Sequence, residues 1–274
     1  MRLRFLLLYP VLLAAQQQPL PVEPASVLNA GEAAVSLGAG YLHDQPFPLS
    51  GLSGDLARVG TLRFGIAVSE YAEMQLEGTL LTALTVRERR PAFNAAVTTT
   101  NDRTADIGDF TVWTKFTVLQ ERRHGLTAGM RLGVQMPNAS NESGLGVDEM
   151  NFYSVFLFEK SFTGRLLVNA GLAIYSDPAR LGSQHDMFVY GAEYRHPVST
   201  DASLYVQAAG RDGHTGPGVP RLATLRAGAE LSRGPLSARF AGILNSAPSD
   251  KARGAELTLT YRFTVIDMKE TPCP

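Results

Sequence analysis

The side chains of this chain that are suited to chemistry are charged residues that alternate with apolar ones. In the stretch Ala255–Phe263, Glu256 and Arg262 share one face of an extended strand, while Leu257 and Leu259 share the other. Charges repeated on one face of many neighbouring strands would form a polar wall that selects solutes by size and charge. The pattern therefore indicates a lined passage rather than a reaction centre.

The same alternation, followed through the whole chain, places nine basic and six acidic side chains on the polar face. They are Arg63, Lys115, Arg131, Arg165, Arg195, Arg211, Arg226, Arg239 and Arg262, with Glu73, Glu77, Glu159, Glu193, Glu230 and Glu256. Two interpretations remain open. These residues line an open or gated lumen with a mild preference for anions, or they pair with one another and close it. A closed lumen could still pass a hydrophobic ligand through a lateral opening.

Catalytic and metal chemistry find little support in the sequence. All five histidines lie in or beside predicted turns and loops: His43, His124, His185, His196 and His214. A hydrolytic site would need a serine, a histidine and an orienting group within hydrogen-bond reach, and no such pattern occurs within a strand. No group of His, Cys and carboxylate residues has metal-ligand spacing. We therefore predict no enzymatic activity, no catalytic residue, no metal and no cofactor.

The elements that must position the charged side chains are β-strands. Twelve alternating segments follow one another, and the last of them is Ala255–Phe263. Tight turns, such as Ser69–Glu70 and the charged turn Glu121–Gly125, alternate with longer loops, such as His43–Asp55 and Thr85–Ala105. A soluble sandwich would also alternate, but it would not confine its long loops to one end. We predict an all-β fold, a transmembrane antiparallel up-and-down β-barrel of about twelve strands, with its short turns at the periplasmic end.

The apolar faces of these strands carry no charged residue, which is the arrangement that lipid enforces. A Lys or Arg facing lipid at mid-bilayer costs about 2–4 kcal/mol, and a closed barrel satisfies every backbone hydrogen bond. No apolar run reaches the roughly 18 residues that a membrane-spanning helix needs. The chain has 25 basic and 26 acidic residues among 274, so no basic excess predicts a nucleic-acid partner.

The sequence divides into four segments. Residues 1–15 read as a signal peptide, with Arg2 and Arg4 before an apolar run and Ala14-Ala15 as a cleavage site. Residues 16–31 form a proline-bearing polar stretch that we expect to be a periplasmic leader. Residues 32–263 form the barrel, and residues 264–274 form a periplasmic tail. Together these features predict the bacterial outer membrane as the location.

Several short motifs resemble one known family. Gly108-Asp109-Phe110 opens a strand, Lys115-Phe116 follows in it, and the next strand ends in Gly133-Val134-Gln135-Met136-Pro137. With the loop Gly144–Asp148 and the strand residues Asn169–Gly171, they resemble the transporter-type outer-membrane β-barrel family grouped under the MetA-pathway of phenol degradation. That resemblance implies an outer-membrane channel, with some members linked to aromatic catabolism. The final strand also resembles the signal that the barrel assembly machinery reads.

These observations lead to an expected function and expected partners. We expect a channel for passive passage of small solutes, aromatic or hydrophobic compounds among them; the alternative is a non-conducting barrel with a structural or surface role. The expected partners are outer-membrane lipid and lipopolysaccharide, the barrel assembly machinery and a small-molecule solute. Arg87, Arg89, Arg90 and Arg103 lie in the largest predicted loop, where they bind lipopolysaccharide phosphates, guide anions or simply face solvent.

Overall fold

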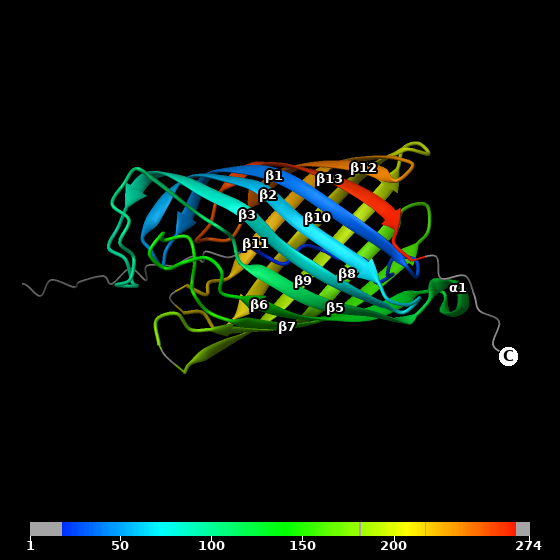
Figure 1. Cartoon of the computed structure of the whole chain (residues 1–274), viewed down its shortest axis with the longest axis horizontal. Coiled ribbons are helices and arrows are strands. Elements are labelled where there is room, and N and C mark those ends of the chain that lie inside the picture. The colour runs from blue at the N-terminus through cyan, green and yellow to red at the C-terminus, as the bar shows by residue number, and fades with distance from the viewer. Residues whose placement is uncertain (1–17, 181, 217, 267–274) are drawn as a thin grey trace, which may run out of the picture.

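The structure, a computed structural model, describes residues 18–180, 182–216 and 218–266. Figure 1 shows a single barrel built of long strands that are tilted relative to its axis. The elements are β1 Glu32–Phe47, β2 Leu52–Ala67, β3 Ala72–Arg89, β4 Arg103–Asp106, β5 Phe110–Leu119, α1 Glu121–His124, β6 Thr127–Met136, β7 Asn151–Ser161, β8 Arg165–Ser176, β9 Gln184–Pro197, β10 Ala202–Gly213, β11 Leu222–Arg233, β12 Leu236–Asn245 and β13 Arg253–Thr264. The predicted signal peptide, and residues 267–274 of the predicted tail, lie outside the described residues.

Twelve of these strands close into an antiparallel barrel, as predicted. Each strand pairs with its neighbour in the chain, and β1 pairs with β13 to complete the ring, with Leu37 opposite Leu259. The short β4 is an addition that pairs only with the outer part of β3. Closure leaves no open sheet edge in the barrel wall, so its backbone hydrogen bonds are made between strands.

The two ends of the barrel differ as predicted. Glu32 at the start of β1 lies opposite Thr264 at the end of β13, so both strand termini lie at one end. The tight connections are at this end, including residues 162–164 and 234–235, and α1 joins β5 to β6 there (Figure 1). The predicted charged turn 121–125 is thus a single helical turn that Gly125 ends with φ 73°. Among the described residues, no helix has the length and apolar character to cross a bilayer.

The strands are longer at the opposite, outer end than the sequence predicts. The expected loop 43–55 is mostly strand, since β1 continues to Phe47 and β2 begins at Leu52. Arg87 and Arg89 belong to β3 instead of the expected loop. Turn-forming residues suggested loops there, but irregular pairing between β1 and β2 accommodates them. The outer wall therefore projects beyond the band of apolar side chains.

The outward face of the barrel is apolar and exposed. Phe156 on β7, Leu172 on β8 and Val206 on β10 are 54%, 60% and 57% exposed. They belong to a large set of similarly exposed apolar side chains on all sides of the barrel. Exposed apolar patches far larger than a few hundred Å² mark interaction or membrane surfaces. The barrel wall therefore has the surface of a protein that sits in lipid.

This arrangement predicts that Phe156→Arg will destabilise the barrel in lipid by about 2–4 kcal/mol, because a guanidinium would face hydrocarbon. The matched control is Phe93→Arg, since Phe93 is equally exposed at 52% but lies in the outer loop between β3 and β4. Urea unfolding of the refolded protein in liposomes measures both free energies. Equal stability of the two variants would mean that Phe156 does not face lipid.

Candidate functional site

The lumen is occupied by residues 18–31, which we term the luminal segment. For residues 18–31, this corrects the prediction of a periplasmic leader over residues 16–31, and residues 16 and 17 lie outside the described residues. The Glu23 backbone N–H donates to Asn169 Oδ1 at 2.6 Å, and Asn169 Nδ2 donates back to the Glu23 carbonyl at 2.9 Å. Thr117 Oγ1 donates to the Ala25 carbonyl at 2.7 Å. Because Asn169 and Thr117 are buried inward residues of β8 and β5, the segment runs inside the barrel.

An extended chain inside a barrel must satisfy its own backbone groups. Pro19, Pro21 and Pro24 lack an N–H and so remove three donors that would otherwise need partners. The Leu28 N–H donates to Glu73 Oε2 at 3.0 Å, and the Ser26 N–H donates to Glu159 Oε2 at 3.2 Å. The proline content that suggested a free leader is equally suited to a segment held against a polar wall.

The Glu23 carboxylate is the centre of a buried ionic cluster. Its side chain is 1% exposed, and it pairs with Arg63, with Lys115 Nζ at 3.0 Å and with Arg131 Nη1 at 3.6 Å. Gln75 Nε2 also donates to it at 3.2 Å. We call these residues, together with the wall carboxylates Glu73 and Glu77, the Glu23 cluster.

Charges in the Glu23 cluster balance only when the luminal segment is present. Lys115 also contacts Glu73 at 3.2 Å, and Arg131 also contacts Glu77 at 3.0 Å. The barrel wall therefore supplies three cations and two carboxylates, and Glu23 supplies the third carboxylate. Burial alone would raise the pKa of Glu23, but the charges of the three cations outweigh it and hold that pKa well below its usual range. Glu23 is thus ionised at neutral pH.

Apolar and aromatic side chains fill the lumen beside β5–β9. Trp113 stacks on Tyr153 with ring centroids 5.2 Å apart, and the Arg131 guanidinium lies 3.5 Å from the Trp113 ring centroid. Ala25 and Leu20 of the luminal segment pack against this cluster. The sequence predicted Arg131 as a lumen-lining charge, but burial under Trp113 and Glu23 takes it away from the open part of the lumen. This half of the barrel is a packed core.

A second apolar group narrows the outer end of the lumen. It joins β1, β2, β3 and β12 to the outer loops, and we term it the outer apolar cluster. Its members are Leu42, Phe47, Leu52, Leu56, Leu84, Leu145, Ile243 and Ala252, with Val86 packed against them. Alternation alone did not reveal it, because the members from the outer loops reach the lumen only in the folded barrel.

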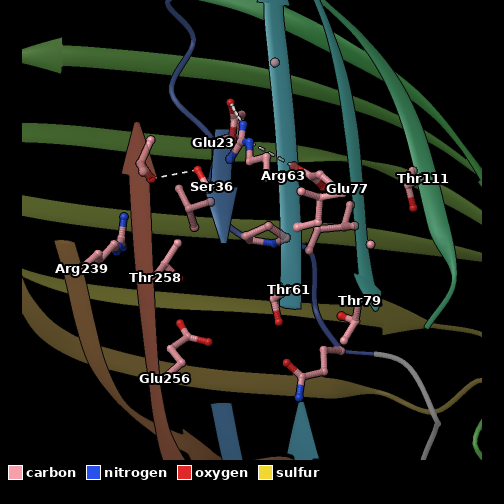
Figure 2. Close-up of a pocket in the computed structure, with 18 of the residues that line it drawn as sticks. Glu23, Ser36, Thr61, Arg63, Glu77, Thr79, Thr111, Arg239, Glu256 and Thr258 are labelled. Atoms are coloured by element: carbon pink, nitrogen blue, oxygen red, sulfur yellow. Dashed lines mark hydrogen bonds and ion pairs between the residues drawn. The ribbon is translucent and has the colours of Figure 1, made fainter. Parts of the chain in front are cut away.

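The open part of the lumen is a cavity of about 690 Å³. It lies along the seam between β1 and β13, where it is bordered by Ser36, Thr258 and Thr260. Ser36 pairs with Thr260, and Gly38 pairs with Thr258. These residues are small, whereas the opposite wall carries Trp, Tyr, Arg and Met side chains, so the space is left on the seam side. Figure 2 shows Ser36, Thr258 and Glu256 near this space, with Glu23 and Arg63 at its inner edge.

Other predicted inward charges form pairs within the lumen. Glu193 is fully buried and contacts Arg195 at 2.8 Å and Arg239 at 2.6 Å, while Arg195 reaches Glu230 at 2.9 Å. The remaining close pairs are Glu159–Arg165 at 2.6 Å and Arg226–Glu256 at 3.2 Å. Most of the charges that were predicted to line the lumen are therefore engaged with one another.

The predicted lumen-lining residues thus separate into two sets. Those that border the cavity are Arg63, Glu73, Glu77, Lys115, Arg165, Arg195, Arg226, Glu230, Arg239, Glu256 and Arg262. Those packed away from it are Arg131, Glu159, Glu193 and Arg211. Arg211 Nε donates to the Pro220 carbonyl at 2.9 Å, and its guanidinium lies over Tyr175. Only the first set is placed to meet a solute.

One cavity residue, Arg58 on β2, escaped the sequence analysis. Thr61 and Arg63 face the lumen, so strict alternation would turn Arg58 outward. Gly60 is an extra residue in the pairing of β1 with β2, since Gly38 pairs with Thr61 and Ala39 with Val59. Its φ of 68° suits a glycine bulge that shifts the alternation by one residue. The glycine within the strand pattern was the sequence signal that could have indicated this bulge.

Three residues that could bind a metal come together at the outer end. His43, Asp44 and Asp55 place their ligand atoms within 4.8 Å of one another. Asp55 is already bound to Arg87 at 2.7 Å and to His43 Nδ1 at 2.8 Å. His43 and Asp44 are consecutive on β1, whereas Asp55 comes from the paired strand β2, so the sequence spacing gave no sign of this proximity. Their pairing with Arg87 accounts for the group without a metal.

Comparisons with known proteins support the fold. Neither a scan against models of protein families nor a search of characterised protein sequences finds a match. The resemblance to the MetA-pathway group therefore stays a prediction. The translocator domain of the autotransporter NalP from Neisseria meningitidis matches with a TM-score of 0.51 at 13% identity, covering 85% of this chain and 89% of that chain. LpxR from Salmonella typhimurium matches with a TM-score of 0.50 at 7% identity, covering 82% and 99%. The chain has the fold of bacterial outer-membrane β-barrels.

Proposed function

We propose that this chain is a channel of the bacterial outer membrane through which small solutes diffuse passively. The single observation that carries the proposal is the cavity of about 690 Å³ inside a closed barrel with an apolar exterior. Its wall offers hydroxyl and guanidinium groups to a solute, while lipid would cover the outer face. Small aromatic or otherwise hydrophobic compounds belong to the size range of this space.

The path runs along the seam of β1 and β13. The luminal segment occupies the other side of the lumen, and the outer apolar cluster narrows the outer mouth. We therefore infer a narrow channel whose conductance depends on how firmly these two groups stay in place. Passive diffusion through this passage would need no energy-coupling element.

The same packing favours one other function. With most luminal charges paired and both apolar clusters in place, the barrel could serve as a non-conducting structural or surface protein. Conductance across a planar bilayer separates the two proposals. Discrete current steps from refolded protein would support the channel. A pure, folded sample that produces neither current steps nor leakage of small solutes from liposomes would leave the structural role.

A charge reversal tests which residues border the path. Arg262 on β13 borders the cavity, is exposed and makes no ion pair within the part of the chain that the structure describes. Arg262→Glu should shift the reversal potential in a salt gradient towards cation preference, because a fixed negative charge replaces a positive one. The control is Arg233→Glu, which alters an exposed arginine beside the β11–β12 turn. Unchanged selectivity of Arg262→Glu would place the path elsewhere.

Outer-membrane lipid, lipopolysaccharide and the barrel assembly machinery are the partners that this function requires. β13 offers the machinery a strand that alternates Leu257, Leu259, Tyr261 and Phe263 outward, the last two stacked 5.9 Å apart. At the outer end, Arg89 donates to the carbonyls of Thr99 and Asn101. Internal contacts of this kind order the outer rim that would meet lipopolysaccharide.

A further inference from the structure

The cavity is polar at its centre and apolar at one end. Phe47, Leu56 and Leu145 of the outer apolar cluster border it towards the outer mouth. Arg58 follows Leu56 by two residues on the same strand, so the two side chains project from the same face of β2. A molecule that filled this space would touch a guanidinium and an apolar surface at once.

Arg58 has no carboxylate ion-pair partner among the described residues. It forms no ion pair within residues 18–180, 182–216 and 218–266, whereas Arg195, Arg226 and Arg239 on the same side of the lumen are each paired with a glutamate. Glu256 is the carboxylate that acts on it electrostatically, but Glu256 is already bound by Arg226 at 3.2 Å. Gly40 pairs with Arg58 on one side and with Glu256 on the other, and a Cβ at Gly40 would touch Arg58 Nη2 at 3.7 Å, so the Arg58 guanidinium lies close to Gly40. This part of the cavity therefore has a local excess of positive charge.

Hydroxyl groups surround the same space. Figure 2 shows Thr258 and Glu256 on one strand and Thr61 on another, and all three border the cavity. Hydroxyls donate to an anion, or accept from a hydrated one, without adding charge. A guanidinium with neighbouring hydroxyl donors suits a carboxylate, because the planar guanidinium can donate two parallel hydrogen bonds to its two oxygens.

We propose that the cavity is a binding site for small organic anions that carry one carboxylate and an apolar ring or chain, with Arg58 as the residue that holds the carboxylate. The apolar part lies against Leu56 and Phe47. The volume of about 690 Å³ falls within the range of small-molecule sites. This inference rests on the proposed function and deepens it, since it names the class of solute that would bind within the channel.

The test measures binding and conduction separately. Isothermal titration calorimetry of the refolded full chain in detergent uses benzoate, its neutral counterpart benzyl alcohol, and acetate, which lacks the ring. Benzoate should bind at least about tenfold more tightly than either, because only benzoate offers both features. Equal affinity for benzoate and benzyl alcohol would overturn the proposal.

Variants tie the binding to Arg58. Arg58→Gln should weaken benzoate binding by about tenfold or more, whereas Arg233→Gln should leave it unchanged. Arg58→Lys keeps the charge but loses the paired hydrogen bonds, so it should bind with intermediate affinity and serves if Arg58→Gln fails to fold. Heat-modifiable migration in SDS gels reports folding of each variant. Unaltered benzoate affinity in folded Arg58→Gln or Arg58→Lys would overturn the assignment.

Conductance measurements separate the proposed binding site from the proposed channel. A barrel that conducts but does not prefer benzoate would refute the site and leave the channel. A barrel that binds benzoate through Arg58 but passes no current would refute the channel and leave the site.

Discussion

A chain refolded from residue 30 onward, without most of the luminal segment, will conduct several-fold more current than a chain refolded from residue 16 onward. The segment fills the lumen between the seam cavity and the wall of β5–β8, where Glu23, Ala25 and Ser26 contact inward side chains. Its loss would join that space to the cavity. Single-channel recording in planar bilayers measures the change.

The same deletion should also alter selectivity. Without Glu23, the barrel wall retains Arg63, Lys115 and Arg131 against Glu73 and Glu77, a net gain of one positive charge. The reversal potential in a salt gradient should therefore move towards anion preference.

A control replaces residues 91–96 of the outer loop, which are largely exposed, with Gly and Ser in the chain that begins at residue 16. This variant should conduct like its parent. If the shortened chain conducts no more than the chain from residue 16, the luminal segment does not limit the path, and the outer apolar cluster becomes the principal constriction.

The second large effect is expected from Glu23→Lys. This substitution would place a fourth cation among Arg63, Lys115 and Arg131 at a site that is 1% exposed. Removing one partner of a buried ion pair costs about 3–5 kcal/mol because the remaining charge is left uncompensated, and a like charge adds repulsion. The luminal segment should therefore leave its site, because Glu23 is its only charged residue and the repulsion acts directly on it.

The fluorescence of Trp113 would show whether the luminal segment has left its site. Trp113 is the only tryptophan in the sequence, it is 1% exposed, and it belongs to the apolar cluster that Ala25 and Leu20 cover. Quenching of its fluorescence by acrylamide should rise markedly in Glu23→Lys. In Glu88→Lys, which changes an exposed glutamate at the outer end of β3, quenching should match the parent. Trp113 that stays protected in folded Glu23→Lys would show that the cluster does not hold the segment.

Glu23→Gln provides a graded comparison. Gln keeps the shape of the side chain but not the charge, so Arg63, Lys115 and Arg131 lose their third carboxylate without gaining a competitor. Quenching of Trp113 should then lie between that of the parent and that of Glu23→Lys. The order of the three proteins in acrylamide quenching separates two effects. One is the loss of the attraction between Glu23 and the three cations, and the other is the repulsion added by Lys at position 23.

The order of the strands and the side that each residue faces followed from the sequence. Alternation with period two depends only on backbone geometry, so Leu172 outward and Glu193 inward could be assigned without knowing any neighbour. The count of twelve barrel strands and the separation of turns from loops followed for the same reason. These are local properties, and a barrel repeats them around its wall.

Errors arose where local geometry departs from that repeat. The bulge at Gly60 shifts the alternation, so Arg58 faces the lumen against the simple pattern. At the outer end, the residues of 43–55 read as turn formers, yet the paired neighbour strand holds most of them extended. Glycine within a strand is a visible signal of a bulge, but its consequence depends on how the partner strand is aligned.

The sequence by itself determined the lipid-facing and lumen-facing sides of the wall, because that assignment needs only the alternation of apolar and polar residues. Tertiary structure alone decided what fills the lumen. Residues 18–31 have no periodic pattern, and their place beside Asn169 and Thr117 depends on contacts between distant parts of the chain. The sequence interpretation took the excess of inward cations as a mild preference for anions, whereas folding places the Glu23 carboxylate among three of them. Charges near one another in space must balance when water is excluded, and only the closed barrel determines which ones are near.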